Sequence, residues 1–254
     1  MEVYHENSKI QPSDIELFWN VTTVNSSPQI RRFLTRPFAN YVGHPVVPLS
    51  KEFAPSALSF ESVLMGRRSE HKFSGKPVAL ESLAKALFLG DGIVEKKPIE
   101  EESSFYLRTA PSGGALYPVE LYCFAFRVDG LPSGSYFYNP LQHHLELQAE
   151  MDFSAALGEA AGLKHEFEGA AACIALVGVL PRSSFKYGQR AYRFILLEAG
   201  HIAQNILLAA EAMGLGALPI GGFMDNQTNA LLKLDGCQEF VIYLVLIGKR
   251  TPKV

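Results

Sequence analysis

The amino-acid sequence predicts an α+β fold. Three apolar segments, at residues 120–128, 171–179 and 240–247, have the composition of buried strands. Residues 80–88 and 193–213 instead carry the apolar stripe of helices. Because strands and helices do not alternate in the strict order of a doubly wound protein, the class is α+β.

Residues 1–55 are expected to form an N-terminal arm that wraps a core formed by residues 56–254. Six prolines interrupt any long periodic run in the arm, namely Pro12, Pro28, Pro37, Pro45, Pro48 and Pro55. Short helical turns fit the pattern at 14–20 and 29–34. No repeat, low-complexity tract or linker divides the rest of the chain, so we expect a single domain there.

The first half of the core begins with a predicted helix at 59–68. A second follows from Leu80, with apolar residues at the i, i+3, i+4, i+7 and i+8 positions, and Gly90 is expected to end it. The charged residues 95–104 predict an exposed loop. The strand at 120–128 is followed by a hairpin with strands at 135–138 and 144–147.

The second half begins with an Ala-rich helix at 151–163 and a strand at 171–179. The longest helix, at 193–213, is apolar over more than one face, which predicts burial in the core or in a subunit interface. Gly214 is expected to end it. The strand at 240–247 completes the fold.

The composition restricts the function classes. With 23 Lys plus Arg against 26 Asp plus Glu, the net charge is −3, which argues against a nucleic-acid-binding protein that works by neutralising phosphates. No run of about 18 apolar residues is present, so no membrane span is predicted.

The cysteines predict a reducing compartment. Cys123, Cys173 and Cys237 are far apart and form no CxxC pair, so neither a metal site nor a disulfide framework is expected. The beginning of the sequence also lacks the apolar core of a secretory signal. We therefore expect a cytoplasmic protein without a bound metal.

One segment has the composition of a phosphate site. Arg67, Arg68 and Ser69, followed by His71, offer guanidinium, hydroxyl and imidazole donors in a short stretch. The alternative interpretation of this segment is a solvated basic turn.

Two glycine-containing segments are candidates for contact with a flat ligand. The loop of Pro111, Ser112, Gly113 and Gly114 lets the backbone approach a ring closely, although it also fits a plain tight turn. Gly221-Gly222 follows an apolar strand and exposes backbone N–H groups. Neither segment has the glycine fingerprint of a dinucleotide-binding site.

Lys186-Tyr187 is a candidate acid–base pair, because burial lowers the pKa of a lysine and a nearby cation lowers that of a tyrosine. Both side chains reach one ligand only from a turn or a helix start, and the alternative is a charged surface loop. Glu198, His201 and Asn205 form a polar stripe on the longest helix. A hydrogen-bonded core histidine is the expectation for His201.

The order and spacing of these segments resemble the FMN-dependent nitroreductase superfamily, over about residues 55–250. Within it, the sequence is most similar to the SagB/McbC-type azoline dehydrogenases, which oxidise thiazolines and oxazolines in modified peptides. The resemblance rests on RRSEHKF, RTAPSGGALYPVELY, DGLPSGSYFYNP and the segment KYGQRAYRFILLEAGHIAQNILLAAEAMGLG, with YHENSK at the start.

The resemblance implies a nitroreductase-like fold with three α-β-α layers, a mostly antiparallel central sheet and long helices at a homodimer interface that binds FMN. Arg67, Arg68, Ser69 and Lys249 or Arg250 would contact the phosphate and ribityl chain. A basic residue commonly stands at the position of His71. Pro111–Gly114 would approach the ring from the partner subunit, and the backbone of Gly221 and Gly222 would face it.

The resemblance also assigns a function. Lys186-Tyr187 matches the catalytic pair of the azoline dehydrogenases, which simple nitroreductases lack. The implied partners are a peptide substrate and a cyclodehydratase complex. Two alternatives stay open: an NAD(P)H-dependent nitro- or quinone reductase, and a non-catalytic flavin-binding scaffold subunit.

Overall fold

A seven-stranded antiparallel sheet organises the fold in the computed structural model, which describes residues 6, 8–11, 13–27, 41–100 and 103–252. The strand order is β1-β8-β7-β5-β9-β11-β10, and each neighbouring pair is antiparallel. The strands are β1 Val46–Pro48, β5 Val119–Ala125, β7 Gly134–Asn139, β8 His144–Ala149, β9 Ala172–Val179, β10 Leu215–Ile220 and β11 Glu239–Lys249. The three predicted buried strands and the predicted hairpin are confirmed.

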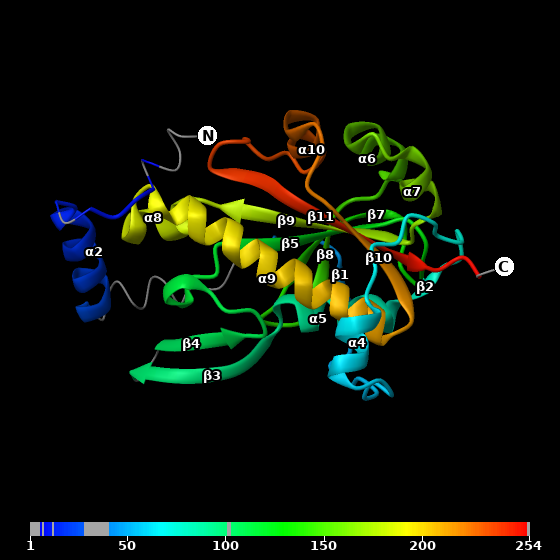
Figure 1. The fold of residues 1–254 in the computed structure, drawn as a ribbon, viewed down its shortest axis with the longest axis horizontal. Helices are drawn as coiled ribbons and strands as arrows, with labels where there is room; N and C mark the ends of the chain where they lie inside the picture. Colours follow the sequence, from blue (N-terminus) through cyan, green and yellow to red (C-terminus); the bar gives the residue numbers. More distant parts are fainter. Residues whose placement is uncertain (1–5, 7, 12, 28–40, 101–102, 253–254) are drawn as a thin grey trace.

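Helices cover both faces of this sheet (Figure 1). One core packs α5, Leu80–Asp91, and α9, Arg190–Ala212, on the first face. The other core packs α6, Ser154–Ala161, and α7, Lys164–Gly169, on the second face. Each strand serves both cores because successive side chains point to opposite faces. In β5, Leu121 and Cys123 belong to the first core, and Tyr122 and Phe124 to the second. The three-layer α-β-α architecture is confirmed.

The smaller elements lie around these layers. They are α2 Ile15–Ser26, α4 Phe60–Gly66, α8 Pro181–Tyr187, α10 Asp225–Leu231, the short helical turn η1 Gly113–Ala115, and the two-stranded parallel sheet of β2 Val78–Ala79 and β6 Val128–Asp129. Before residue 56, β1 pairs with β8 at one edge of the large sheet and α2 packs against α8. The helical turn expected at 29–34 lies outside the described residues.

The structure corrects the expectation of an exposed loop at 95–104. The chain here forms a β-ribbon of β3, Ile93–Glu100, and β4, Ser103–Arg108, which projects from the body of the protein (Figure 1). Side chains 94–98 are exposed, as their charge predicts. The backbone groups nevertheless pair with one another across the two strands, and a charge pattern contains no information about that pairing.

The structure also corrects the predicted end of α5. Gly90 does not end the helix, which continues to Asp91. A Cβ at Gly90 would lie 2.7 Å from Cγ1 of Ile206 on α9. Glycine at this position therefore permits the close approach of α5 and α9. The longest helix also begins at Arg190, three residues before the expected start at Arg193.

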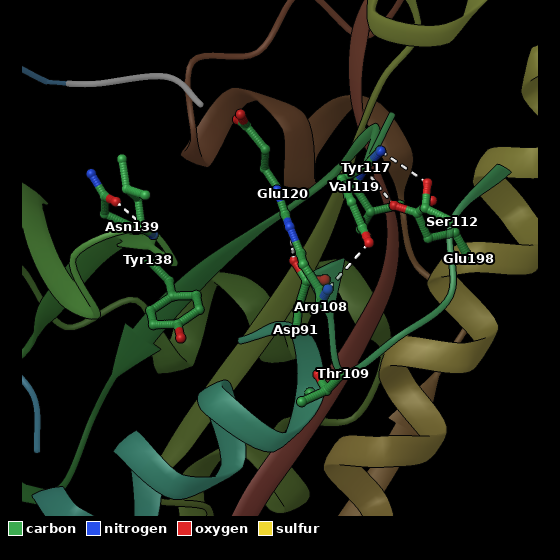
Figure 2. A network of polar contacts seen from close by, with 12 residues as sticks. Asp91, Arg108, Thr109, Ser112, Tyr117, Val119, Glu120, Tyr138, Asn139 and Glu198 are labelled. Atoms are coloured by element: carbon green, nitrogen blue, oxygen red, sulfur yellow. Dashed lines mark hydrogen bonds and ion pairs between the residues drawn. The ribbon is translucent and has the colours of Figure 1, made fainter. Parts of the chain in front are cut away.

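A buried polar network crosses the first core, formed by Asp91, Arg108, Ser112, Tyr117 and Glu198 (Figure 2). Arg108 forms an ion pair with Asp91, and its backbone N–H donates to Oη of Tyr117 at 3.1 Å. The backbone N–H of Tyr117 donates to Oγ of Ser112 at 2.9 Å. The network therefore joins α5 and β4 to the loop before β5.

Glu198 on α9 adds a buried carboxyl group to this network. Its Oε1 accepts a hydrogen bond from the backbone N–H of Val119 at 3.2 Å. Burial raises the pKa of Glu198 to about 8, although hydrogen bonding to Ser112 opposes the shift. Burial also raises the pKa of Asp91 to about 6, although Arg108 opposes that shift. Removal from water thus favours the neutral form of both carboxyls.

The substitution Glu198→Gln is expected to change the pH dependence of stability. In the wild type, the neutral form is favoured in the folded state, so the free energy of unfolding falls as pH rises from about 4.5 towards 8 and then levels off. The variant lacks this titration. The free energy of unfolding of the variant, relative to that of the wild type, should therefore rise by a few kcal/mol across that window. Urea unfolding at each pH measures it.

The exposed Glu159→Gln on α6 is the matched control and should follow the wild-type profile. A constant difference between Glu198→Gln and the wild type from pH 5 to pH 9 would contradict the prediction.

Candidate functional site

The two basic segments predicted to form a phosphate site lie together at the end of α9. Beyond α4, the chain runs beside β10 and the end of β11. The backbone N–H of Glu70 donates to the carbonyl of Ala217 at 3.0 Å, and that of Ser74 to the carbonyl of Lys249 at 2.9 Å. These hydrogen bonds bring Arg67, Arg68 and Ser69 close to Lys249 and Arg250. We call these five residues the phosphate cluster.

The side chains of the phosphate cluster have protein partners of their own. Nη1 of Arg68 donates to the carbonyls of Met65 and Arg67, both at 2.8 Å. Arg250 forms an ion pair with Glu211 near the end of α9. These contacts hold the cations at the end of α9, while Arg68 and Lys249 remain exposed to solvent.

His71 points away from the phosphate cluster. Its Nδ1 lies 3.2 Å from Oε1 of Glu166 on α7, and its side chain is 60% exposed. His71 therefore connects the segment after α4 to α7, in the helix layer on the second face of the sheet.

Gly221 and Gly222 follow the end of β10, an edge strand of the large sheet. The phosphate cluster lies beside the start of the same strand. About five residues of β10 separate Gly216 from Gly221, which corresponds to about 17 Å of extended chain. Both glycines are exposed, and a Cβ at Gly222 would meet no atom within 4 Å. Their backbone is thus open to a ligand along the strand from the cations.

Lys186 and Tyr187 form the last turn of α8, which ends at Gly188 with a φ of +52°. Lys186 is only 5% exposed, so the alternative of a solvated surface loop is wrong for this residue. Its Nζ lies 5.2 Å from the centroid of the Tyr187 ring. The Tyr187 ring packs edge-on against Phe194 at 4.8 Å between centroids.

The Pro111–Gly114 loop lies directly against this pair. A Cβ at Gly114 would overlap Oη of Tyr187 and lie 2.8 Å from Nζ of Lys186. Gly114 also has a φ of +66°, which disfavours other residues. Close approach and backbone conformation together explain the glycine. Two segments that the sequence predicts separately are therefore in contact.

The contacts that hold this region were not identified from the sequence. Nη2 of Arg182 lies 2.6 Å from Oε1 of Glu120, and its Nη1 donates to the carbonyl of Tyr117 at 3.2 Å. Arg182 thus fastens α8 to the start of β5, while the buried polar network fastens the loop at Ser112. The sequence signal that could have indicated these contacts is Glu120, a charged residue near the start of an otherwise apolar strand.

Two expectations about side-chain environment are corrected. Burial raises the pKa of the Tyr187 phenol, whereas a lowering by the neighbouring cation was expected. Tyr187 is therefore a hydrogen-bond donor at neutral pH. His201 is exposed on α9 and is not a core histidine. The buried polar residue of that stripe is Glu198, because α9 turns this position towards the loop before β5.

The length of α9 separates the two parts of the candidate site. Phe194, beside Tyr187, and Glu211, beside Arg250, are seventeen residues apart on this helix. At 1.5 Å per residue the separation is about 25 Å. The phosphate cluster and the Lys186-Tyr187 pair of one chain therefore lie too far apart to hold the two ends of one mononucleotide.

The donor groups fit a flavin mononucleotide. The phosphate cluster supplies guanidinium and ammonium groups for a single phosphate. The open backbone of Gly221 and Gly222 supplies N–H groups along the same strand for a heterocyclic ring. Among the described residues, no group of three or more His, Cys, Asp and Glu side chains is placed to hold a metal ion.

Within the described part of the chain, no helix is both long enough and apolar enough to span a membrane.

Comparisons with known proteins identify the family. Residues 64–249 match the family described as "Nitroreductase family". The chain is 32% identical over 196 residues to "Putative nitroreductase MJ1384" of Methanocaldococcus jannaschii, covering 76% of this chain and 92% of that protein. It is also 32% identical over 137 residues to the microcin B17-processing protein McbC of Escherichia coli, covering 50% of this chain and 49% of McbC.

Solved structures show the same fold. A "putative nitroreductase" of Anabaena variabilis matches with a TM-score of 0.74 and 28% identity over 97% of this chain and 45% of that chain. The E. coli microcin synthetase McbBCD complex with truncated pro-MccB17 matches with a TM-score of 0.62 and 20% identity over 96% of this chain and 95% of that chain.

A further neighbour was solved with FMN, the "putative nitroreductase in complex with fmn" of Desulfovibrio desulfuricans. Its TM-score is 0.53 at 20% identity, over 78% of this chain and 89% of that chain. The resemblance inferred from the motifs is confirmed. The family match covers more than two thirds of the chain, and the protein therefore belongs to the nitroreductase family.

Proposed function

We propose that this protein is an FMN-dependent oxidoreductase that dehydrogenates azoline rings in peptides to azoles. The observation that carries the proposal is the buried Lys186 beside the half-buried Tyr187, with both side chains close to Gly114. The similarity to McbC, a microcin-processing protein, supports a peptide substrate. The aligned region spans about half of McbC, so the substrate assignment rests mainly on the pair.

The cofactor would be held by the phosphate cluster and by the backbone of Gly221 and Gly222. Arg67, Arg68 and Arg250 would bind the phosphate, with Ser69 as a hydroxyl donor. When bound, FMN accepts a hydride from the ring that is oxidised. The other tasks, which are binding, orientation and proton transfer, fall to side chains of this protein.

Dehydrogenation of an azoline removes one hydride and one proton from the ring. A lysine that is withdrawn from water can take a proton in its neutral form, and Nζ of Lys186 is the proposed acceptor. Burial keeps the phenol of Tyr187 protonated, so its Oη would donate a hydrogen bond that orients the substrate. The Pro111–Gly114 loop shields this proton transfer from one side.

The site is complete only in a homodimer, because one chain places its two parts about 25 Å apart. A two-fold axis that crosses α9 would bring the start of one copy to the end of the other. The exposed side of α9 suits such contact, since Leu196 and Leu197 are 38% and 55% exposed and Gly200 faces open space. Phe60 and Met65 on α4, which packs against α9, are exposed as well, at 66% and 70%.

A cyclodehydratase is the partner that the reaction requires, because an azoline must first be formed from a cysteine, serine or threonine side chain and the backbone. The McbBCD neighbour is a complex that holds a peptide precursor, which supports such an assembly. The alternative function is an NAD(P)H-dependent nitro- or quinone reductase, favoured by the match to the M. jannaschii protein over 92% of its length.

The FMN-loaded protein should bleach when it is mixed without oxygen with an azoline-containing peptide, measured as the loss of flavin absorbance. The azole product, two hydrogens lighter, should appear in equal amount by mass spectrometry. Bleaching by NADPH alone would favour the reductase. If neither compound reduces the flavin, the scaffold alternative stands.

The substitution Leu197→Glu should dissociate the homodimer and release the flavin, because it places a charge in the proposed apolar interface. Light scattering and flavin absorbance after gel filtration report both effects. Met151→Glu is the matched control, since Met151 is similarly exposed, at 52%, on the other face of the sheet. A monomer that keeps its flavin would refute the shared site.

Lys186→Ala and Tyr187→Phe should each slow azoline oxidation by about 10²–10⁴-fold while FMN stays bound, because groups outside the pair are proposed to hold the cofactor. The rate of flavin bleaching measures the effect. Tyr192→Phe, which removes a hydroxyl from the start of α9, is the control and should react at the wild-type rate. Wild-type rates in both variants would disprove the assignment.

A further inference from the structure

A cavity of about 650 Å³ lies beside the Lys186-Tyr187 pair. One wall consists of Tyr187 and the turn that leads to Arg190, and the other consists of residues of the N-terminal arm between Glu6 and Asn20. We call it the arm cavity. Its volume is within the range of ligand-binding sites. Since Tyr187 lines it, a molecule bound there lies against one member of the proposed catalytic pair.

Two arginines of α9 fix the arm in this position. Nη1 of Arg190 donates to the carbonyl of Ser8 at 2.5 Å, and Nη2 of Arg193 contacts Oγ of Ser8. Ser8 is 1% exposed, although it precedes the first described helix. Hydrogen bonds from guanidinium groups are stronger than neutral ones. The arm is therefore fastened to the helix that directly follows the pair.

The helix α2 provides a second attachment. It packs against α8, the helix that ends in Lys186 and Tyr187 (Figure 1). A hydrogen bond from the backbone N–H of Gln11 to Oδ2 of Asp14, at 2.7 Å, shapes the turn that leads into α2. The arm thus contacts the catalytic region on both sides of the cavity.

The chemistry of the cavity indicates its ligand. Among the described lining residues of the arm, only Ile10 is apolar, and the others are polar or charged. Lys9 and Glu6 neutralise each other in an ion pair of 2.5 Å. A nitroaromatic or quinone would require mainly apolar and aromatic walls. A peptide offers N–H and C=O groups at every residue, which polar walls can satisfy.

We propose that the arm cavity binds the peptide residues that flank the azoline, so that the N-terminal arm determines which substrates reach Lys186 and Tyr187. This inference rests on the proposed function, and it adds the element that recognises the peptide. Flanking residues do not react, so their binding energy should appear chiefly in KM.

The test fills the cavity without disturbing the core. Ser13 lines the arm cavity and is exposed, and Ser13→Trp would occupy part of the space. Ser26→Trp, at the exposed end of α2 and outside the lining, is the matched control. Both FMN-loaded variants are compared with the wild type on an azoline within a long peptide and on the same azoline with both ends capped directly.

For the long peptide, Ser13→Trp should raise KM at least tenfold and leave kcat within twofold. The capped azoline should react equally well with all three proteins, and Ser26→Trp should match the wild type. Equal losses on both substrates, or equal effects of the two tryptophans, would overturn the proposal.

A binding measurement separates this proposal from the proposed function. The affinity for a fluorescently labelled azole peptide, followed by anisotropy, should fall at least tenfold in Ser13→Trp only. If the wild type binds the peptide in this way but oxidises no azoline, the cavity stands and the azoline dehydrogenase function fails. If the wild type oxidises both azolines and Ser13→Trp leaves KM unchanged for each of them, the function stands and the cavity assignment fails.

Discussion

The packing of α9 against the antiparallel sheet is the constraint on which the rest of the structure depends. Residues from α9, α5, β5 and β9 form one continuous core, and Gly90 allows α5 to approach Ile206 closely. Because α9 is long and crosses the sheet, the two groups of candidate site residues at its ends lie far apart (Figure 1). Cations gather at its end, and the Lys186-Tyr187 pair lies before its start. The proposal of a homodimer follows from this length.

Buried polar groups then fix the loops around that helix. The ion pair of Asp91 and Arg108 and the carboxyl of Glu198 are enclosed in a mainly apolar layer, where unpaired groups are costly (Figure 2). Each group finds a partner on a different element, so the network determines where the Pro111–Gly114 loop lies. Stability is reduced by burying carboxyls, and in return the loop is held against α8.

The fold therefore separates the tasks of the proposed site. An edge strand with open glycines and nearby cations suits a planar cofactor with one phosphate. A short helix, fastened by Arg182 to Glu120, presents a buried amine and a half-buried phenol. The N-terminal arm encloses a polar space beside them. In the proposed function, α8 and the N-terminal arm would direct the reaction towards a peptide.

The sequence by itself determined the class, the strands and the main helices, because side-chain periodicity depends on local geometry and on burial. It also marked the cationic, glycine-containing and Lys-Tyr segments as candidates, although each segment by itself also fits an ordinary turn or surface loop. Tertiary structure alone decided that Gly114 touches Tyr187, that Glu198 is buried while His201 is exposed, and that residues 93–100 and 103–108 pair as a ribbon. Each of these depends on contacts between residues that are distant in the chain, or on the rotation of a helix against its neighbours, and no local pattern encodes them.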